Sequence, residues 1–384
     1  MNDVYDAKIY GMRHKREKSL GEFSVPKIAD AITTYTSVTG LAANLPGAIA
    51  NMLVGKLQMF IECGAREFFN YKDMSKAVAK YWAWLPPLLG EVASNDRKSK
   101  LGLLMRFYDI TDDIYDEMKR TGFYTNPIHK IIGNTSLMFM YGMGEHLLHA
   151  QGMLACLIHE KCKDSTGTER SILDAFDVNV VDGNGELTIK EGFTDLDGNP
   201  LTIEYMKRFR ERITYVNGSM HGLFGADEKG LIHMYAVGRL IMNFRQWMPA
   251  HYARRFNKRH WDATLQQYRE GYYVTTGKFV WRLLKDMKKT EFHWITRYNQ
   301  LDAMEKANMR RMYREVFALV ILFLLSGLSF GDDPKHRSWI ESLTKYEIRR
   351  MYMETSASCP VNLAGFISNF LKTLNSPMAA ISSA

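Results

Sequence analysis

The stretch DAMEKANMRRMYREVFALVILFLL, residues 302–325, predicts one long helix. Asp302 and Glu305 match the capping-box pattern, in which each side chain accepts a hydrogen bond from a backbone N–H of the first turn. The helix runs into VFALVILFLLSGLSF, residues 316–330, which is the most apolar run of the chain. A helix of 15 residues spans about 22 Å, less than the roughly 30 Å of bilayer hydrocarbon. We therefore expect this run to be buried on all sides in a larger assembly, with conditional membrane insertion as the alternative. The residues that would insert are Val316, Phe317, Leu319, Leu322 and Leu325.

Most of the remaining chain also shows helical periodicity. The predicted segments cover residues 25–44, 46–69, 73–86, 100–108, 126–161, 337–353 and 361–374, and helices also fill most of the chain from residue 203. Ala48, Ala50 and Gly55 are small enough to let another helix approach closely. Asp73 is expected to cap one of these helices, and the pair Pro86-Pro87 is expected to end it, because proline lacks the backbone N–H that continues a helix.

One region breaks the helical pattern. Residues 178–181 (VNVV) and 187–190 (LTIK) flank the turn sequence DGNG, which predicts a β-hairpin. The fold class is therefore mainly α, a multi-helix bundle-like assembly with a small β-hairpin insert near residues 177–202.

This pattern predicts five parts of the chain. They are a polar basic N-terminal segment (1–25), a helical domain (26–163), a β-hairpin insert or linker (164–202), a basic helical domain (203–375) and a flexible tail (376–384).

Composition excludes several classes of protein. With 384 residues, 46% of them hydrophobic, and only 28 Gly and 10 Pro, the chain is neither collagen-like nor of low complexity. Four scattered cysteines fit neither a disulfide framework nor a metal-ligand spacing, which favours a reducing compartment. The polar N-terminus lacks the apolar core of a secretory signal. Phosphate-binding, dinucleotide-binding and GxSxG motifs are absent from the sequence, so we expect a non-enzymatic protein without a cofactor.

Positive charge is concentrated in one stretch. The whole chain has a net charge of +8, whereas residues 201–315 hold 22 Lys or Arg against 11 Asp or Glu, a net +11. Clustered cations favour a partner with negative charge, either nucleic acid or anionic lipid. The alternative is a solvated helical face that binds no partner.

Within this stretch, residues 248–273 interleave aromatic and cationic side chains. If the segment is a helix, Arg254 with Lys258 and Arg255 with Arg259 form like-charge pairs that phosphates would neutralise, and nearby aromatic rings could stack on bases. Lipid headgroups would serve the cations similarly. The alternative is that the aromatic residues form core and the cations their solvated flank. The predicted anionic-surface contacts are Arg245, Tyr252, Arg254, Arg255, Lys258, Arg259, Trp261 and Arg269.

Two patterns suggest a metal site, and neither meets its requirements. His146 and His149 lie one turn apart beside Glu145, but the zinc-protease spacing is absent. A calcium loop that begins at Asp182 would need an acidic twelfth residue, and that residue is Phe193. We therefore expect no metal site.

Several stretches resemble the C-terminal region of the very large virion proteins of crAss-like bacteriophages. They are NMLVGKLQMFIECGAREFFNYKDM (51–74), SKLGLLMRFYDI (99–110), DEKGLIHMYAVGRLIMNFRQWMPAHYARRF (227–256), REGYY (269–273) and LNSPMAAISSA (374–384). Because those proteins are far longer, this chain is either a separate short gene product or part of a longer protein.

The resemblance implies a virion cargo or ejection protein. Such a protein is carried in the capsid interior or tail lumen and delivered into the host cell with the genome. Its partners would be portal, tail and other cargo proteins, in several copies, with DNA as a further partner and membrane contact after ejection. The alternatives are a membrane-active component of a passage through the host envelope and a non-catalytic module of a virion RNA polymerase assembly. The resemblance supplies no catalytic residues.

Overall fold

The structure, a computed structural model, describes residues 19–20, 23–24, 32, 45–94, 98–108, 110, 136–181, 184–222, 247–287, 294–327, 338–356 and 359. These residues form eleven helices and four two-stranded antiparallel sheets. The helices are α3 (Leu45–Ala65), α4 (Tyr71–Ser94), α5 (Lys100–Phe107), α8 (Ser136–His159), α9 (Ile172–Ala175), α10 (Ile203–His221), α12 (Trp247–Phe256), α13 (Tyr272–Met287), α14 (Trp294–Asn299), α15 (Ala303–Gly327) and α16 (Trp339–Ser356). The prediction of a mainly α fold with small β-hairpins is confirmed.

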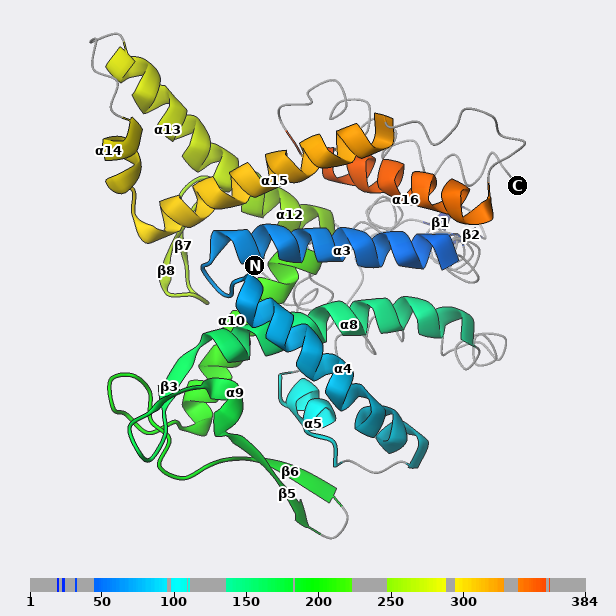
Figure 1. The fold of residues 1–384 in the computed structure, drawn as a ribbon, viewed down its shortest axis with the longest axis vertical. Coiled ribbons are helices and arrows are strands. Elements are labelled where there is room, and N and C mark those ends of the chain that lie inside the picture. Colours follow the sequence, from blue (N-terminus) through cyan, green and yellow to red (C-terminus); the bar gives the residue numbers. More distant parts are fainter. Residues whose placement is uncertain are drawn as a thin grey trace.

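Helix α3 lies at the centre of the molecule. It packs against α8 on one side and against α15 and α16 on the other (Figure 1). At the contact with α8, a Cβ atom on Gly55 would lie 2.3 Å from Cδ1 of Leu148, so any larger residue would require the Leu148 side chain to shift. The close helix packing predicted at Gly55 is confirmed.

The main hydrophobic core lies between α3, α4, α5, α8 and α10. Its buried side chains include Met59, Phe69, Tyr81, Leu104, Leu154 and Val216. Helix α10, from the predicted second helical domain, therefore shares a core with helices of the first. The domain boundaries themselves stay a prediction.

Of the two helix caps predicted from the sequence, the one at Asp302 is confirmed and the one at Asp73 is corrected. At α15, the backbone N–H of Glu305 donates to Asp302 and that of Asp302 donates to Glu305, so the predicted capping box is confirmed. At α4 the cap is Asn70, whose Oδ1 accepts from the N–H groups of Lys72 (2.8 Å) and Asp73 (3.1 Å). Asp73 is the reciprocal partner in the first turn and not the cap.

The prediction that Pro86-Pro87 ends a helix is wrong. Helix α4 contains both prolines and continues to Ser94. Proline removes the hydrogen bonds that would reach the carbonyls of Trp82 and Ala83. Both of those residues are exposed, so water can take the place of the missing donors.

The predicted β-hairpin around residues 178–190 is present, and a further hairpin that the sequence did not predict precedes it. Strands β3 (Lys161–Lys163) and β4 (Glu169–Ser171) form the first, and β5 (Phe176–Val181) and β6 (Asn184–Ile189) form the second. The remaining strands are β1 (Ser19–Leu20), β2 (Phe23–Ser24), β7 (His260–Asp262) and β8 (Gln267–Arg269). Several predicted segments lie largely or wholly outside the described residues: 1–25, the helices 25–44 and 361–374, and the tail 376–384.

Candidate functional site

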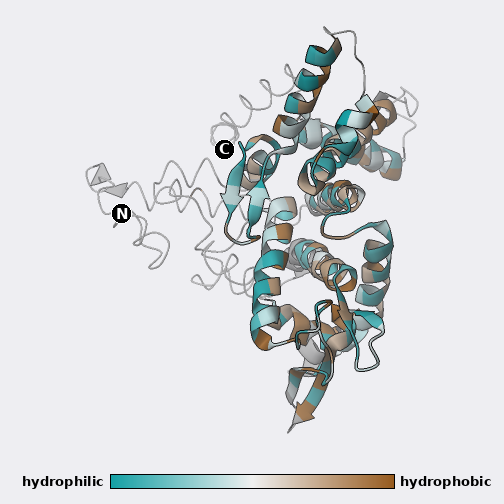
Figure 2. Cartoon of the chain, turned by 90° about the vertical axis from the view of Figure 1, so that its left-hand side faces the viewer, coloured by the Kyte–Doolittle hydropathy of each residue, from teal (hydrophilic) through white to brown (hydrophobic). Residues whose placement is uncertain are grey.

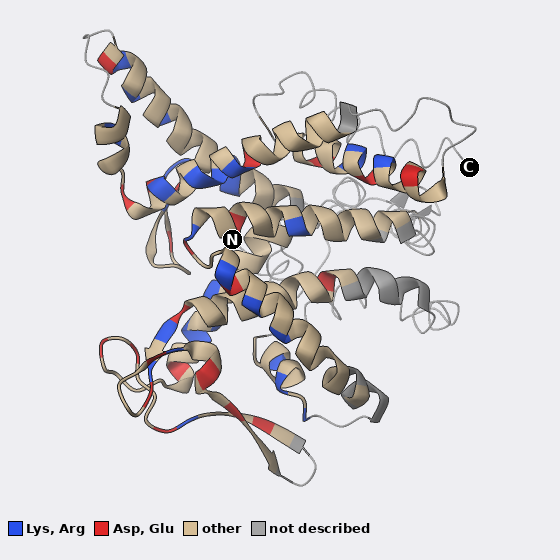
Figure 3. Ribbon diagram, in the orientation of Figure 1, with Lys and Arg blue, Asp and Glu red and all other residues tan. Residues whose placement is uncertain are grey.

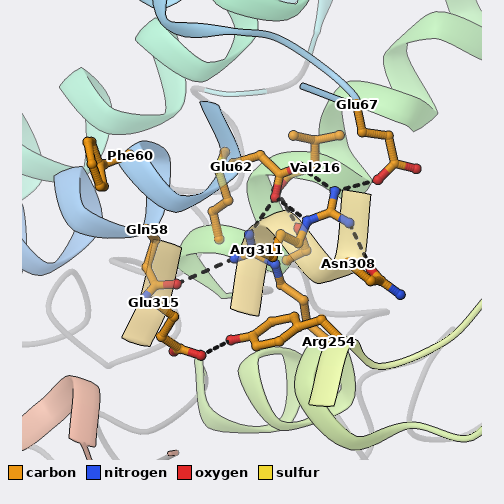
Figure 4. Close-up of polar contacts among 12 residues, drawn as sticks. Gln58, Phe60, Glu62, Glu67, Val216, Arg254, Asn308, Arg311 and Glu315 are labelled. Atoms are coloured by element: carbon orange, nitrogen blue, oxygen red, sulfur yellow. Dashed lines mark hydrogen bonds and ion pairs between the residues drawn. The ribbon is translucent and has the colours of Figure 1, made fainter. Parts of the chain in front are cut away.

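The most polar part of the interior is a set of arginines and glutamates where α3 meets α12, α15 and β8 (Figure 4). We call it the arginine–glutamate network; its members are Glu62, Glu67, Arg254, Arg269 and Arg311. The guanidinium of Arg311 donates to both carboxylate oxygens of Glu62, with Nε 3.0 Å from Oε2, and it also pairs with Glu67. The side chains of Glu62 and Arg311 are each only 2% exposed.

The other two arginines complete the network. Arg254 pairs with Glu62, and Arg269 pairs with Glu67. Each glutamate therefore bridges two arginines, and all four carboxylate oxygens accept hydrogen bonds. The charges of the network are therefore paired with groups of the same chain.

A second buried ion pair lies between α12 and α15. The Nε atom of Arg255 donates to Oε1 of Glu315 at 3.0 Å, and the hydroxyl of Tyr272 donates to Oε2. The Arg255 side chain is 1% exposed. A Cβ atom on Gly271 would lie 2.5 Å from the backbone carbonyl carbon of Arg255, so only glycine fits beside this pair.

Electrostatics keeps these groups ionised despite burial. Burial alone would raise the pKa of Glu62, but Arg311 and Arg254 outweigh it and lower the pKa to about 2. The pKa of Glu67 is lowered because Arg311 and Arg269 likewise outweigh burial. Burial would lower the pKa of Arg255, but Glu315 more than compensates and raises it. Buried charges of this kind are tolerated only when they are fully paired.

The network and the Arg255–Glu315 pair correct part of the predicted anionic interface. Arg254, Arg255 and Arg269 are buried and paired with carboxylates of the same chain, so they do not face a partner. Arg245 lies outside the described residues. Figure 3 shows further positive charge along the N-terminal half of α15, where Arg311 belongs to the network.

Residues 248–273 do not form one helix, which was the condition for the like-charge pairs. Helix α12 ends at Phe256, and the chain then forms the β7–β8 hairpin before α13 begins. The like-charge pairs expected between Arg254 and Lys258, and between Arg255 and Arg259, therefore do not form across helical turns.

The hairpin itself presents an exposed aromatic and cationic surface. Trp261 and Tyr268 are cross-strand partners, with ring centroids 5.2 Å apart and ring planes at 76°. They are 55% and 54% exposed, respectively. The Arg259 guanidinium lies 5.4 Å from the centroid of the Tyr268 ring. We call Lys258, Arg259, His260, Trp261 and Tyr268 the β7–β8 platform; Lys258 and His260 are exposed as well.

Of the predicted contact residues, Lys258, Arg259 and Trp261 lie in the platform, and Tyr252 is exposed on α12. His260 and Tyr268 are platform residues that the sequence did not single out as contacts. The signal for Tyr268 was the short turn between Asp262 and Gln267, which places Tyr268 opposite Trp261 once the two segments are paired as strands.

The predicted membrane-inserting residues differ in their exposure on α15. Leu322 is buried, Val316 and Leu319 are half-buried, and Phe317 and Leu325 are exposed. The run is therefore buried on one face only within the chain. Among the described helices, none combines the length and hydrophobicity that a membrane span requires.

The histidines of α8 do not converge on a metal. His146 faces the Tyr81 hydroxyl at 3.3 Å, whereas His149 faces the His221 ring at 5.1 Å. Burial lowers the pKa values of His146 and His149 to about 4, and burial raises the pKa of Glu145 to about 7. Within the described part of the chain, no three His, Cys, Asp or Glu side chains could hold a metal ion together.

Comparisons with family models, with curated proteins and with solved structures find no match to this chain.

Proposed function

We propose that the protein is a bacteriophage virion cargo protein that contacts nucleic acid through the β7–β8 platform. It is packaged in the capsid interior or tail lumen beside portal, tail and other cargo proteins, and it enters the host with the genome. The resemblance to crAss-like virion proteins supports the virion role. The exposed Trp261–Tyr268 pair with Arg259 is the observation that carries the nucleic-acid contact.

The chemistry of the platform favours single-stranded nucleic acid. Two exposed aromatic rings offer stacking surfaces to unpaired bases, and stacking tolerates any sequence because every base has a π-face. Lys258 and Arg259 lie close to Trp261 in the sequence. Arg259 is 3.8 Å from a carboxylate oxygen of Asp302, but both side chains are about half exposed, so a phosphate can compete for this cation as well as bind Lys258. A duplex would satisfy the cations but would leave the rings without bases to stack on.

The test is equilibrium binding of a labelled oligo-thymidine strand and of a duplex of equal length, measured by fluorescence anisotropy. Stacking contributes about 1–3 kcal/mol per base, and 1.4 kcal/mol corresponds to about tenfold in Kd. Trp261→Ala with Tyr268→Ala should therefore weaken single-strand binding by about tenfold or more. Lys258→Gln with Arg259→Gln should reduce the slope of the salt dependence of binding by about one unit for each phosphate that is no longer neutralised.

The matched control is Trp339→Ala, which removes a tryptophan of α16 that is more exposed than Trp261 (71% against 55%) and lies outside the platform. It should bind like the unaltered protein. The nucleic-acid proposal fails if the unaltered protein binds neither oligonucleotide, or if the platform variant binds as tightly as the control.

A further inference from the structure

Helices α13 and α14 form an arm that projects from the body of the molecule (Figure 1). The first part of α13 is anchored, because Tyr272, Thr275 and Phe279 are buried. Helix α14 is tied to the far part of α13 by the bidentate pair between Arg297 and Asp286, with donor–acceptor distances of 2.7 and 3.1 Å. We call residues 272–287 and 294–299 the α13–α14 arm.

The projecting part of the arm exposes large apolar side chains. They are Val280, Trp281, Leu284, Met287, Trp294 and Ile295, with exposures from 46% for Val280 to 70% for Trp281. Val280, Leu284 and Met287 recur at helical spacing and so share one face of α13. Figure 2 shows α13 as the uppermost helix, with both hydrophobic and hydrophilic residues along its length. Large apolar side chains exposed along one helix face mark an interaction surface.

Cations accompany this apolar face. Lys278, Arg282 and Lys285 recur at the same helical spacing and occupy the opposite side of α13, and all three are exposed. Lys278 pairs with the buried carboxylate of Glu270, so Arg282 and Lys285 are the cations of α13 that the arm offers to a partner. Trp281 lies between the two faces. The arm as defined holds four Lys or Arg and one Asp, a net charge of +3.

This combination distinguishes the arm from the β7–β8 platform. The platform offers only aromatic rings and polar groups, whereas the arm also exposes Leu284, Met287 and Ile295. Aliphatic side chains have no ring to stack on a base, but they gain free energy when they leave water for acyl chains. Trp favours the boundary between water and hydrocarbon, and cations favour anionic headgroups.

We propose that the α13–α14 arm docks on the surface of an anionic lipid bilayer. Its apolar side chains enter the boundary between headgroups and acyl chains, and the long stems of Arg282 and Lys285 keep their charges at headgroup level. The arm lies on the bilayer and does not cross it. The proposal is independent of nucleic-acid binding, because it uses none of the platform residues.

The experiment is co-sedimentation of the intact protein with vesicles of phosphatidylcholine mixed with phosphatidylglycerol, and with vesicles of phosphatidylcholine alone. We expect binding to the anionic vesicles at least tenfold stronger than to the neutral ones. Leu284→Asp with Ile295→Asp should reduce binding to the anionic vesicles by at least tenfold. Arg282→Gln with Lys285→Gln should remove most of the preference for anionic lipid. Both changes alter exposed side chains, and circular dichroism verifies that helix content is retained.

The matched control is Val320→Asp with Leu324→Asp, which places the same charges on the exposed apolar side of α15. It should bind vesicles like the unaltered protein. A fluorescence blue shift on vesicle binding should also disappear in Trp281→Phe with Trp294→Phe.

Three results would overturn the proposal. The first is no binding to anionic vesicles, and the second is full binding by the arm variant with loss in the α15 control. The third is that the arm variants leave vesicle binding intact and instead abolish dimer formation or oligonucleotide binding, which would identify a second copy or nucleic acid as the occupant. The platform variant Trp261→Ala with Tyr268→Ala, by contrast, should bind vesicles like the unaltered protein, even if it no longer binds the oligonucleotide.

Discussion

Glu62 and Arg311 lie 249 positions apart in the sequence, yet Nε of Arg311 is 3.0 Å from Oε2 of Glu62 in the interior of the protein. Through this contact α3 is joined to α15, and Glu62 also joins it to Arg254 on α12. Glu67, two residues after the end of α3, joins Arg269 on β8 to Arg311. The four segments are held together by charge as well as by apolar packing.

Glu62→Gln is therefore expected to destabilise the protein strongly. Removing one partner of a buried ion pair costs about 3–5 kcal/mol, because the remaining charge stays buried without compensation. Glu354→Gln, which breaks the partly exposed pair with Arg350 on α16, should cost less than about 1 kcal/mol. Urea unfolding followed by circular dichroism measures both, and equal losses would show that the network contributes no more than a surface pair.

Stability should fall in acid between about pH 4.5 and pH 2. The folded-state pKa of Glu62 is about 2 against an ordinary value of 4.5, so the unfolded chain binds a proton more readily than the folded one. The stabilisation is complete above the unfolded pKa and is lost as the pH falls through the folded pKa. The shift corresponds to about 3 kcal/mol. Unfolding free energies measured across this window should fall less steeply in Glu62→Gln; parallel curves would contradict the assignment.

Charge reversal should separate the buried cations from the exposed ones. Arg254→Glu with Arg255→Glu places carboxylates against Glu62 and Glu315 and should prevent folding. Lys258→Glu with Arg259→Glu changes exposed side chains and breaks only the half-exposed pair between Arg259 and Asp302, so it should alter stability by about 1 kcal/mol or less. Thermal unfolding of the two double variants compares them directly, and a cooperative, unshifted transition in the first would contradict the buried placement.

Two glycines near α13 should respond to alanine in opposite directions. A Cβ atom on Gly271 would collide with backbone atoms of Arg255 and Phe256, which cannot move aside, so Gly271→Ala should cost about 3 kcal/mol. At Gly277, within α13, a Cβ atom would meet nothing within 4 Å. Gly277→Ala should stabilise by about 1 kcal/mol, because alanine is the better helix former. Chemical denaturation gives the sign of each change, and a neutral Gly271→Ala would contradict the close approach.

The cysteines should react slowly in the folded protein. All four are buried and unbridged, and burial raises the pKa values of Cys63 and Cys156 to about 12. Since only the thiolate reacts, labelling by a disulfide reagent at mildly alkaline pH should be slow until urea is added. Rapid native labelling of Cys63 or Cys156, located by mass spectrometry, would contradict their burial.

Local features of the fold were predictable from the sequence. The capping box at Asp302 and Glu305 and the hairpin around residues 178–190 depend on neighbours within a few positions, and both are present. The sequence did not show which backbone groups are exposed to water, so predictions that depended on this exposure were less reliable. Pro86-Pro87 does not end α4, because the carbonyls without donors belong to exposed residues that water can reach.

The sequence by itself determined that the chain is mainly helical, where its caps and hairpin lie, and that cations gather between residues 201 and 315. Only the tertiary structure decided which cations are buried and which are exposed. The reason is that helix periodicity and capping are interactions between near neighbours, whereas an arginine is buried only if a carboxylate meets it. For Arg254, Arg269 and Arg311 those carboxylates, on Glu62 and Glu67, come from 192 to 249 residues away.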